Sequence, residues 1–261
     1  MSKYVLKRLL IMIPTLIAVG IIMFTLMNFV PGDPAQLALG AGTHTPAEIE
    51  MKRAALGLNR PFMVRLGEYL KNIFLHFDFG KSLIDGTEIK WELMRRFPHT
   101  FKIAIYSIVL TVVIGLPLGV LLVAGEKGGV LPLPKALMKV LNVIINLLRS
   151  VPFLILMILV FPLTRLIVGT AVGTVASIVP LVIASFPFVA RLVESSLREV
   201  NPNIIEAAQS MGASPMQIII KVMIPESVPS LLSNFTIAIT TILGYSAMSG
   251  IIGGGGLGKI A

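Results

Sequence analysis

The closing residues, GGGGLGKIA, place two glycines and a lysine at the spacing of a phosphate-binding loop: Gly253, Gly258 and Lys259. Such a loop also needs a hydroxyl residue after the lysine to hold magnesium, and a strand before the first glycine. Ile260 stands in the hydroxyl position, and an apolar segment of helical character precedes the glycines. We therefore expect a flexible glycine-rich break at the end of a membrane helix, and no nucleotide site on this chain.

The sequence also offers few residues for other catalytic chemistry. The chain has no cysteine, which excludes disulfides, cysteine metal sites and thiol catalysis. His44, His76 and His99 are scattered through one polar stretch without the spacing of metal ligands. The stretch GYSAMSG faintly resembles a membrane serine hydrolase, but that enzyme would need a histidine base inside the membrane. We expect no catalytic residue, no metal and no cofactor.

The composition is typical of a protein embedded in a membrane. Hydrophobic residues make up 55% of the 261 residues and charged residues only 13%, where a soluble domain carries about a quarter. The net charge of +9 does not indicate nucleic-acid binding, because the basic residues form no dense stripe with interleaved aromatics. They cluster beside the apolar segments, as the positive-inside rule expects. The class is an all-α polytopic membrane protein.

Five segments are apolar and long enough to span a membrane, which takes about 20 residues. They are residues 9–30, 102–124, part of 136–168, 171–190 and 228–252. We expect Pro180 and Pro187 to kink the fourth. Residues 31–100 form a polar, mostly helical extramembrane stretch, in which Pro46 and the acids after it predict a helix start.

The distribution of basic residues predicts the orientation. With the N-terminus in the cytoplasm, nine basic residues outside the long polar stretch fall on the inner side: Lys3, Lys7, Arg8, Lys127, Lys135, Lys139, Arg191, Arg198 and Lys221. The predicted organisation is a cytoplasmic N-terminus and first span (1–30), an extracytoplasmic loop (31–100) and a core (101–261). Residues 198–225 of the core form a cytoplasmic segment.

That cytoplasmic segment contains EVNPNIIEAAQSMGASPMQIIIKVMIP. We expect one short helix after Pro202, and a second that starts at Pro215 and ends before Pro225. Ala207, Ala208, Gly212 and Ala213 offer a face with almost no side-chain bulk, which another protein could approach closely. The alternative is an amphipathic linker that packs on its own bundle, and the residues alone leave both readings open.

The same segment carries a family resemblance. Glu206-Ala207-Ala208, three residues, Gly212, nine residues and then Val222-Met223-Ile224-Pro225 resembles the signature of the inner-membrane permease subunits of bacterial ABC importers. The resemblance implies the type I importer permease fold. It also implies coupling helices that insert into a cleft on cytoplasmic ATPase subunits, a second permease subunit (identical or different) and an extracytoplasmic substrate-binding protein. Glu206, Ala207, Ala208, Gly212 and Pro225 would form the ATPase-coupling site.

The two halves resemble different branches of that family. Residues 1–124 are similar to dipeptide, oligopeptide and nickel permeases, in YVLKRLLIMIPTLIAV, FVPGDPA, LGLNRPFMVRLGEYL and DFGKSL. Residues 140–261 resemble methionine permeases, in NLLRSVPFLIL, ASFPFVARLVESSLREV and GYSAMSGIIGGGGLGKIA. Both branches continue with another helix after the glycine-rich turn, so we expect that a final helix is missing from this chain.

Four residues are candidates for the transport path. Arg149 and Pro152 lie inside the third apolar segment, where a charge is costly and usually faces a cavity or partner. The alternative is that Arg149 marks a cytoplasmic helix start. Tyr245 and Met248 lie in a fifth span rich in small residues, where helix packing is the competing explanation.

Two further charges, Arg191 and Glu194, have i, i+3 spacing and could pair at the end of the fourth span. The competing explanation is a solvated helix end.

The function implied is a permease subunit in the bacterial inner membrane, driven by a partner ATPase and carrying methionine or a related amino acid. The alternative cargo, taken from the first half, is dipeptides, oligopeptides or nickel. Arg149 suits either methionine or peptides, because both carry a carboxylate. A passive channel is a different class, and it would not need a cytoplasmic docking segment.

Overall fold

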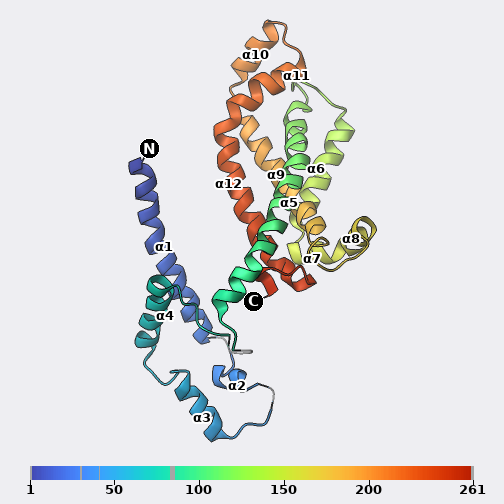
Figure 1. The fold of residues 1–261 in the computed structure, drawn as a ribbon. Coiled ribbons are helices and arrows are strands. Elements are labelled where there is room, and N and C mark those ends of the chain that lie inside the picture. The colour runs from blue at the N-terminus through green and yellow to red at the C-terminus, as the bar shows by residue number, and fades with distance from the viewer. Residues whose placement is uncertain (1, 30, 41, 83–85, 260–261) are drawn as a thin grey trace. The chain divides into compact units, whose positions relative to one another are not determined.

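The computed structural model describes residues 2–29, 31–40, 42–82 and 86–259, and helices joined by turns and loops make up most of its ribbon (Figure 1). No β-strand occurs in the described part, where Lys81 and Glu88 make an isolated bridge. The expected all-α class is therefore confirmed. The chain divides into two compact units, Met1–Met94 and Arg95–Ala261.

The first unit contains one long apolar helix and three short ones. These are α1 (Ser2–Phe29), α2 (Pro34–Leu39), α3 (Pro46–Ala55) and α4 (Phe62–His76). The helix start predicted at Pro46 is confirmed, because Thr45 accepts from the Glu48 amide while the Glu48 carboxylate accepts from the Thr45 amide. The polar stretch after α1 is mostly helical, as predicted.

Helix α4 packs lengthwise on the second half of α1. A Cβ added to Gly20 would meet the Leu70 side chain at 3.2 Å, so the two helices approach closely there. One turn further on, the Phe24 ring lies 5.5 Å from Phe62 and 5.0 Å from Tyr69 between centroids. These apolar and aromatic contacts hold α4 along the helix that the sequence predicted as the first span.

The second unit is a helix bundle. Its helices are α5 (Ile89–Ala124, which begins in the first unit), α6 (Lys135–Ser150), α7 (Phe153–Leu159), α8 (Phe161–Val168), α9 (Ile178–Arg198), α10 (Pro202–Ser210), α11 (Pro215–Ile218) and α12 (Ile224–Met248). A π-helical turn, Ile219–Met223, joins α11 to α12, and 3-10 turns at Ser249–Ile252 and Leu257–Lys259 follow. Helices α10 and α11 lie at one end of the bundle and α7 and α8 at the other (Figure 1).

Helix α9 is the centre of this bundle, since α12, α6 and α7 all contact it. Glycines let α5 approach it as well. A Cβ on Gly115 would lie 2.9 Å from Val189 Cγ1, and one on Gly119 would lie 2.6 Å from the Ala190 carbonyl oxygen. Gly115 and Gly119 are thus the small-xxx-small face that membrane helices use for close packing.

Within the residues that the structure describes, four helices are long and apolar enough to cross a membrane, and a fifth span results if the bent pair α6–α7 counts as one. The bend between α6 and α7 is 112°. The prediction of about five spans therefore agrees with the structure, and the third predicted segment is the broken one.

The placement of the fourth span was wrong. Residues 171–177 are bends and turns, with Gly173 at φ +112, and the helix runs from Ile178 to Arg198. Pro180 therefore lies in the first turn, where proline needs no amide partner and causes no kink. Only Pro187 lies in the helix interior.

The helix end predicted before Pro225 is also wrong. The Ile224 amide donates to the Ile219 carbonyl, five residues back, so the chain passes through a π-helical turn directly into α12. This turn relaxes the i to i−4 pattern that a proline would otherwise break.

Candidate functional site

The predicted coupling segment is a helix–turn–helix at the end of the bundle (Figure 1). Asn201 caps α10 by accepting from the Asn203 amide, and Pro202 occupies the first turn. Ser214 and Gln217 form a capping box at the start of α11. Because both helix starts are satisfied by local side chains, this segment is well defined without help from a partner.

Gly212 has a structural role in the turn between these helices. The Gly212 amide donates to Gln209 and the Ala213 amide to Ala208, which is the Schellman pattern of a helix C-terminus. Gly212 has φ +78, and a Cβ there would meet nothing within 4 Å. The backbone conformation, and not crowding, therefore favours glycine at this position.

The small residues of the segment do not all face the same way. Glu206 and Ala207 are exposed, as are Gly212 and Pro225. Ala208 is buried in a cluster with Val193 and Leu197 of α9 and with Ile218 and Met223. Ala213 packs against this cluster. One side of α10 thus anchors the segment to the bundle, and the opposite side is free to meet another surface.

Exposed methionines border that free side, and sequence reasoning missed them. Met211 is 81% exposed and Met216 is 58% exposed, with Ile204 at 39% on the same segment. Exposed apolar groups that gather at one end of a molecule are typical of a protein contact. The sequence did contain a signal for them. Met211 and Met216 lie beside the caps of α10 and α11, where few side chains are buried. Methionine is a side chain that adapts readily to a partner.

A polar network lies where α9 approaches this segment. Arg191 donates to Glu194 at 2.6 Å and to Asn142 of α6 at 2.7 Å. Arg198 donates to Glu194 at 2.8 Å and to Glu126, after α5, at 3.1 Å. The predicted pairing of Arg191 with Glu194 is confirmed. The solvated alternative is wrong, because those side chains are only 19% and 11% exposed.

Arg149 and Tyr245 line one small cavity of about 160 Å³, together with Phe153 and Thr241. The Phe153 and Tyr245 rings are stacked, with centroids 4.9 Å apart and planes 1° apart. Arg149 lies in the last turn of α6, so the alternative that it starts a helix is wrong. The structure therefore brings two of the four predicted path residues together.

The remaining two path residues lie outside that cavity lining. Pro152 caps α7 at the sharp bend after α6. Met248 ends α12 and is 43% exposed. Among the described residues no group of three or more histidine, aspartate or glutamate side chains is placed to hold a metal ion.

The glycine-rich turn is packed against the bundle, whereas the sequence predicted a flexible break. The Leu257 amide donates to the Thr100 hydroxyl at 2.8 Å, and the Gly254 amide donates to the Ser249 carbonyl at 3.1 Å. Gly253, Gly255 and Gly256 all have positive φ. This stretch is a turn that connects the end of α12 to Thr100, which lies in the first half of α5.

Two family profiles match the chain. "Binding-protein-dependent transport system inner membrane component" matches residues 115–261, and the related N-terminal profile, "Binding-prot-dependent transport system membrane comp, N-term", matches residues 1–104.

Several curated relatives are named as D-methionine transport permeases. A probable D-methionine transport system permease protein MetI of Vibrio cholerae is 54% identical over 57% of this chain and 65% of its own length. The relative from Pasteurella multocida is 46% identical over 66% of this chain and 79% of its own length. The Escherichia coli K12 protein is 45% identical over 61% of this chain and 73% of its own length. The chain thus spans just under two thirds of the first of these relatives.

Solved structures give the same grouping. The MetNI methionine ABC transporter in an inward-facing conformation matches with TM-score 0.63 and 44% identity, over 66% of this chain and 79% of that one. An amino acid ABC transporter crystallised with histidines matches with TM-score 0.54, over 66% of this chain and 77% of that one. Its sequence identity is 21%, so this likeness shows the fold alone.

Proposed function

The chain belongs to the family of binding-protein-dependent transport system inner membrane components, and on that premise we propose that it is the permease subunit of an ATP-driven importer. It would carry cargo across the membrane, and a partner chain would hydrolyse the ATP. This proposal rests mainly on the free side of α10. Glu206, Ala207 and Met211 are exposed there, at one end of a bundle of apolar, membrane-type helices.

The proposed assembly contains two permease subunits, two cytoplasmic ATPases and an extracytoplasmic binding protein. The free side of α10 and the turn at Gly212 contact the ATPase. Ala208 and the π-helical turn connect that contact to α9 and α12, so a force on α10 acts directly on the two most strongly packed helices. Closure of the ATPases around nucleotide would thereby shift the bundle between two arrangements.

The proposed orientation has the N-terminus, α10 and α11 in the cytoplasm. The basic residues Lys127, Lys135, Lys139, Arg198 and Lys221 all lie near the α10–α11 end or in the helices that lead to it. The positive-inside rule assigns that end to the cytoplasm. Residues 31–100 would then lie on the extracytoplasmic side of a bacterial inner membrane.

The proposed cargo is methionine or a related amino acid. The relatives named as methionine permeases match 57–66% of the chain. Arg149 would contact the cargo carboxylate at the cavity beside Phe153 and Tyr245, whose rings offer an apolar surface for a thioether side chain. Short peptides or nickel are the second candidate, because residues 1–124 resemble the dipeptide, oligopeptide and nickel permeases in FVPGDPA, LGLNRPFMVRLGEYL and DFGKSL.

The coupling proposal is tested by Glu206→Trp, which adds bulk to the free side without touching the core. We expect ATPase co-purification to fall about tenfold, a loss of about 1.4 kcal/mol in binding. The permease should remain in the membrane at normal levels. Substitution at Gly212 is a poorer test, since φ +78 strains any other residue.

The matched control is Glu50→Trp, the same change at an exposed glutamate of α3 in the first unit. It should leave the ATPase bound. Normal retention of the ATPase by Glu206→Trp, at normal expression, would refute α10 as the docking helix.

A further inference from the structure

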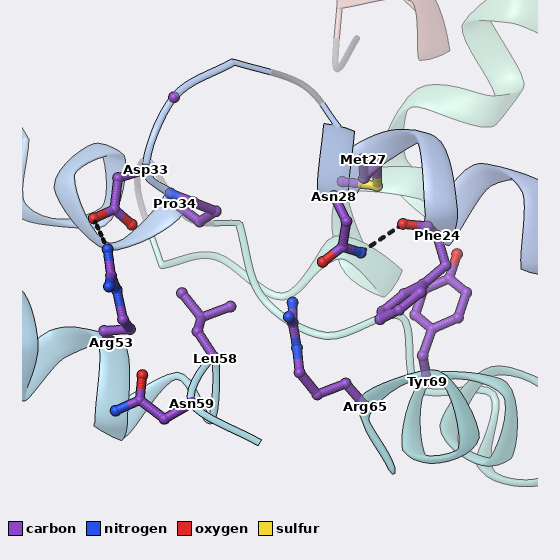
Figure 2. Close-up of a pocket in the computed structure, with 11 residues that line it drawn as sticks. Phe24, Met27, Asn28, Asp33, Pro34, Arg53, Leu58, Asn59, Arg65 and Tyr69 are labelled. Atoms are coloured by element: carbon purple, nitrogen blue, oxygen red, sulfur yellow. Dashed lines mark hydrogen bonds and ion pairs between the residues drawn. The ribbon is translucent and has the colours of Figure 1, made fainter. Parts of the chain in front are cut away.

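The first unit contains an open groove of about 720 Å³ at the C-terminal end of α1 (Figure 2). Its walls differ in chemistry. Phe24 and Met27 of α1 and Leu58 of the α3–α4 turn form apolar walls. Asn28, Asn59 and Arg65 contribute polar groups to the same space. A groove lined in this way suits a molecule that is polar at one end and apolar at the other.

Arg65 is the cation of this groove that has no carboxylate. Arg53 pairs with Asp33 at 2.7 Å, and Arg60 pairs with Glu68 at 2.6 Å. Within the described ranges Arg65 makes no ion pair, and its guanidinium lies 5.7 Å from the Phe24 ring centroid. Figure 2 shows the Arg65 side chain rising from α4 into the space between Leu58 and Asn28. The positive charge is therefore held at the groove by the α4 backbone and an aromatic ring, and is open to an anion.

The groove lies where a membrane span ends. The apolar segment Val5–Phe29 is long enough to cross the hydrocarbon core, and Phe24, Met27 and Asn28 occupy its last turns. Tyr69 packs on Phe24 beside the groove, and aromatic residues at such a position mark the level of the lipid headgroups. Phosphate groups are the anions that are concentrated at this level.

The helix that carries Arg65 also has apolar side chains in contact with solvent. Met63 is 74% exposed and Val64 46% exposed, immediately before Arg65. At a headgroup-level position these side chains would lie among acyl chains, as on an interfacial amphipathic helix.

We propose that this groove binds the phosphate of an anionic glycerophospholipid, in the leaflet at the C-terminal end of α1. The Arg65 guanidinium contacts the phosphate, and the Asn28 and Asn59 amides face the glycerol headgroup. The acyl chains run along Phe24 and Met27. The apolar walls distinguish this ligand from free phosphate, which would gain nothing from them. The bound lipid fastens α4 and the outer part of the first unit to the membrane surface.

Lipid binding to the full-length chain in detergent tests the proposal, with native mass spectrometry as the readout. Phosphatidylglycerol and phosphatidylcholine with the same acyl chains are titrated in parallel. We expect phosphatidylglycerol to bind about fivefold more tightly, as one cation near a membrane surface contributes. Arg65→Gln should abolish this preference. Arg60→Gln removes the same charge from a neighbouring paired arginine and should leave the preference intact.

Two further arms make the result decisive. Arg65→Lys keeps a positive charge at the groove and should retain the preference, which separates charge recognition from altered folding. Inorganic phosphate should not displace the lipid at concentrations comparable to the lipid. An unchanged preference in Arg65→Gln, an equal loss in Arg60→Gln, or displacement by inorganic phosphate would each overturn the lipid site.

Discussion

Two arginines of the Arg95–Ala261 unit lie in or beside apolar helices, and their surroundings are opposite. Arg191 of α9 is mostly buried and is held by Glu194, Asn142 and Asn146, with hydrogen bonds of 2.6 to 2.9 Å. Arg149 of α6 is exposed and, within the described ranges, has no carboxylate and no hydrogen-bond partner. The first charge is neutralised inside the protein, while the second is left available.

The difference separates a structural charge, at Arg191, from the charge at Arg149 that we propose contacts the cargo. A buried charge without a partner is strongly destabilising, so the network around Arg191 is required for the fold around α9. A charge without a partner at the edge of a cavity contributes little to stability, and it can bind a ligand carboxylate instead. The two arginines should therefore respond in opposite ways to substitution, with stability lost at one and transport lost at the other.

The largest expected effect comes from breaking the network at its centre. Glu194 accepts from both Arg191 and Arg198, so Glu194→Gln leaves two cations without their shared anion. We expect a loss of about 3 kcal/mol in stability, the lower end for a buried pair, because Arg198 is 46% exposed. Thermal unfolding of the purified protein in detergent measures it.

A double substitution distinguishes the pair from simple loss of packing. Arg191→Gln combined with Glu194→Gln should recover part of the stability that each single change removes, since no lone charge then remains between them. Strictly additive losses would show that Arg191 and Glu194 are not coupled.

The second effect is expected in transport and not in stability. Arg149→Gln should leave the unfolding temperature almost unchanged, because Arg149 makes no internal bond in the described part of the chain. Transport of an amino acid with a free carboxylate should fall about tenfold, or about 1.4 kcal/mol. Uptake into proteoliposomes that contain the complete complex measures it.

Arg149→Lys sharpens this comparison. It keeps the charge but not the planar fork that binds a carboxylate with two hydrogen bonds, so it should give an intermediate rate. If Arg149→Gln or Arg149→Lys lowered the unfolding temperature as much as Glu194→Gln does, Arg149 would be a structural charge instead.

The smallest effect is expected at the partly exposed pair of Asp33 and Arg53, whose side chains are 17% and 42% exposed. The Ala35 amide, first, and Arg53, second, lower the pKa of Asp33 below its ordinary value of 3.8. A lowered carboxyl pKa in the folded protein adds stability above the unfolded value, and that stability is lost as the pH falls through the folded value. Asp33→Asn should therefore be slightly less stable than the natural sequence near neutral pH, and equally stable well below pH 3.8.

Thermal unfolding of both proteins across this pH range checks the prediction. A difference that persists unchanged in acid would show that the Asp33 charge is not its source. A large difference at neutral pH would contradict the view that an exposed pair contributes little.

Much of the architecture was readable from residue patterns. The helices α1 and α12 and the apolar part of α5 follow from long apolar runs, and the α3 start follows from Pro46 and Glu48. The coupling motif indicated the α10–α11 segment, with its turn at Gly212. The fourth span was misplaced because residues 171–177 are as apolar as a helix, and the Gly173 backbone that interrupts them leaves no mark on hydropathy.

The amino-acid sequence by itself determined that lipid is the solvent, that there are about five spans and where a local cap such as Pro46 starts a helix, because these depend on side-chain polarity and on residues a few positions away. Only the tertiary structure decided the long-range partners of the charged groups, since Arg191 meets Asn142 across 49 positions and Arg198 meets Glu126 across 72. It likewise decided that Ala208 faces the bundle while Ala207 is exposed. Burial and long-range pairing depend on neighbours from distant segments, and no local pattern records them.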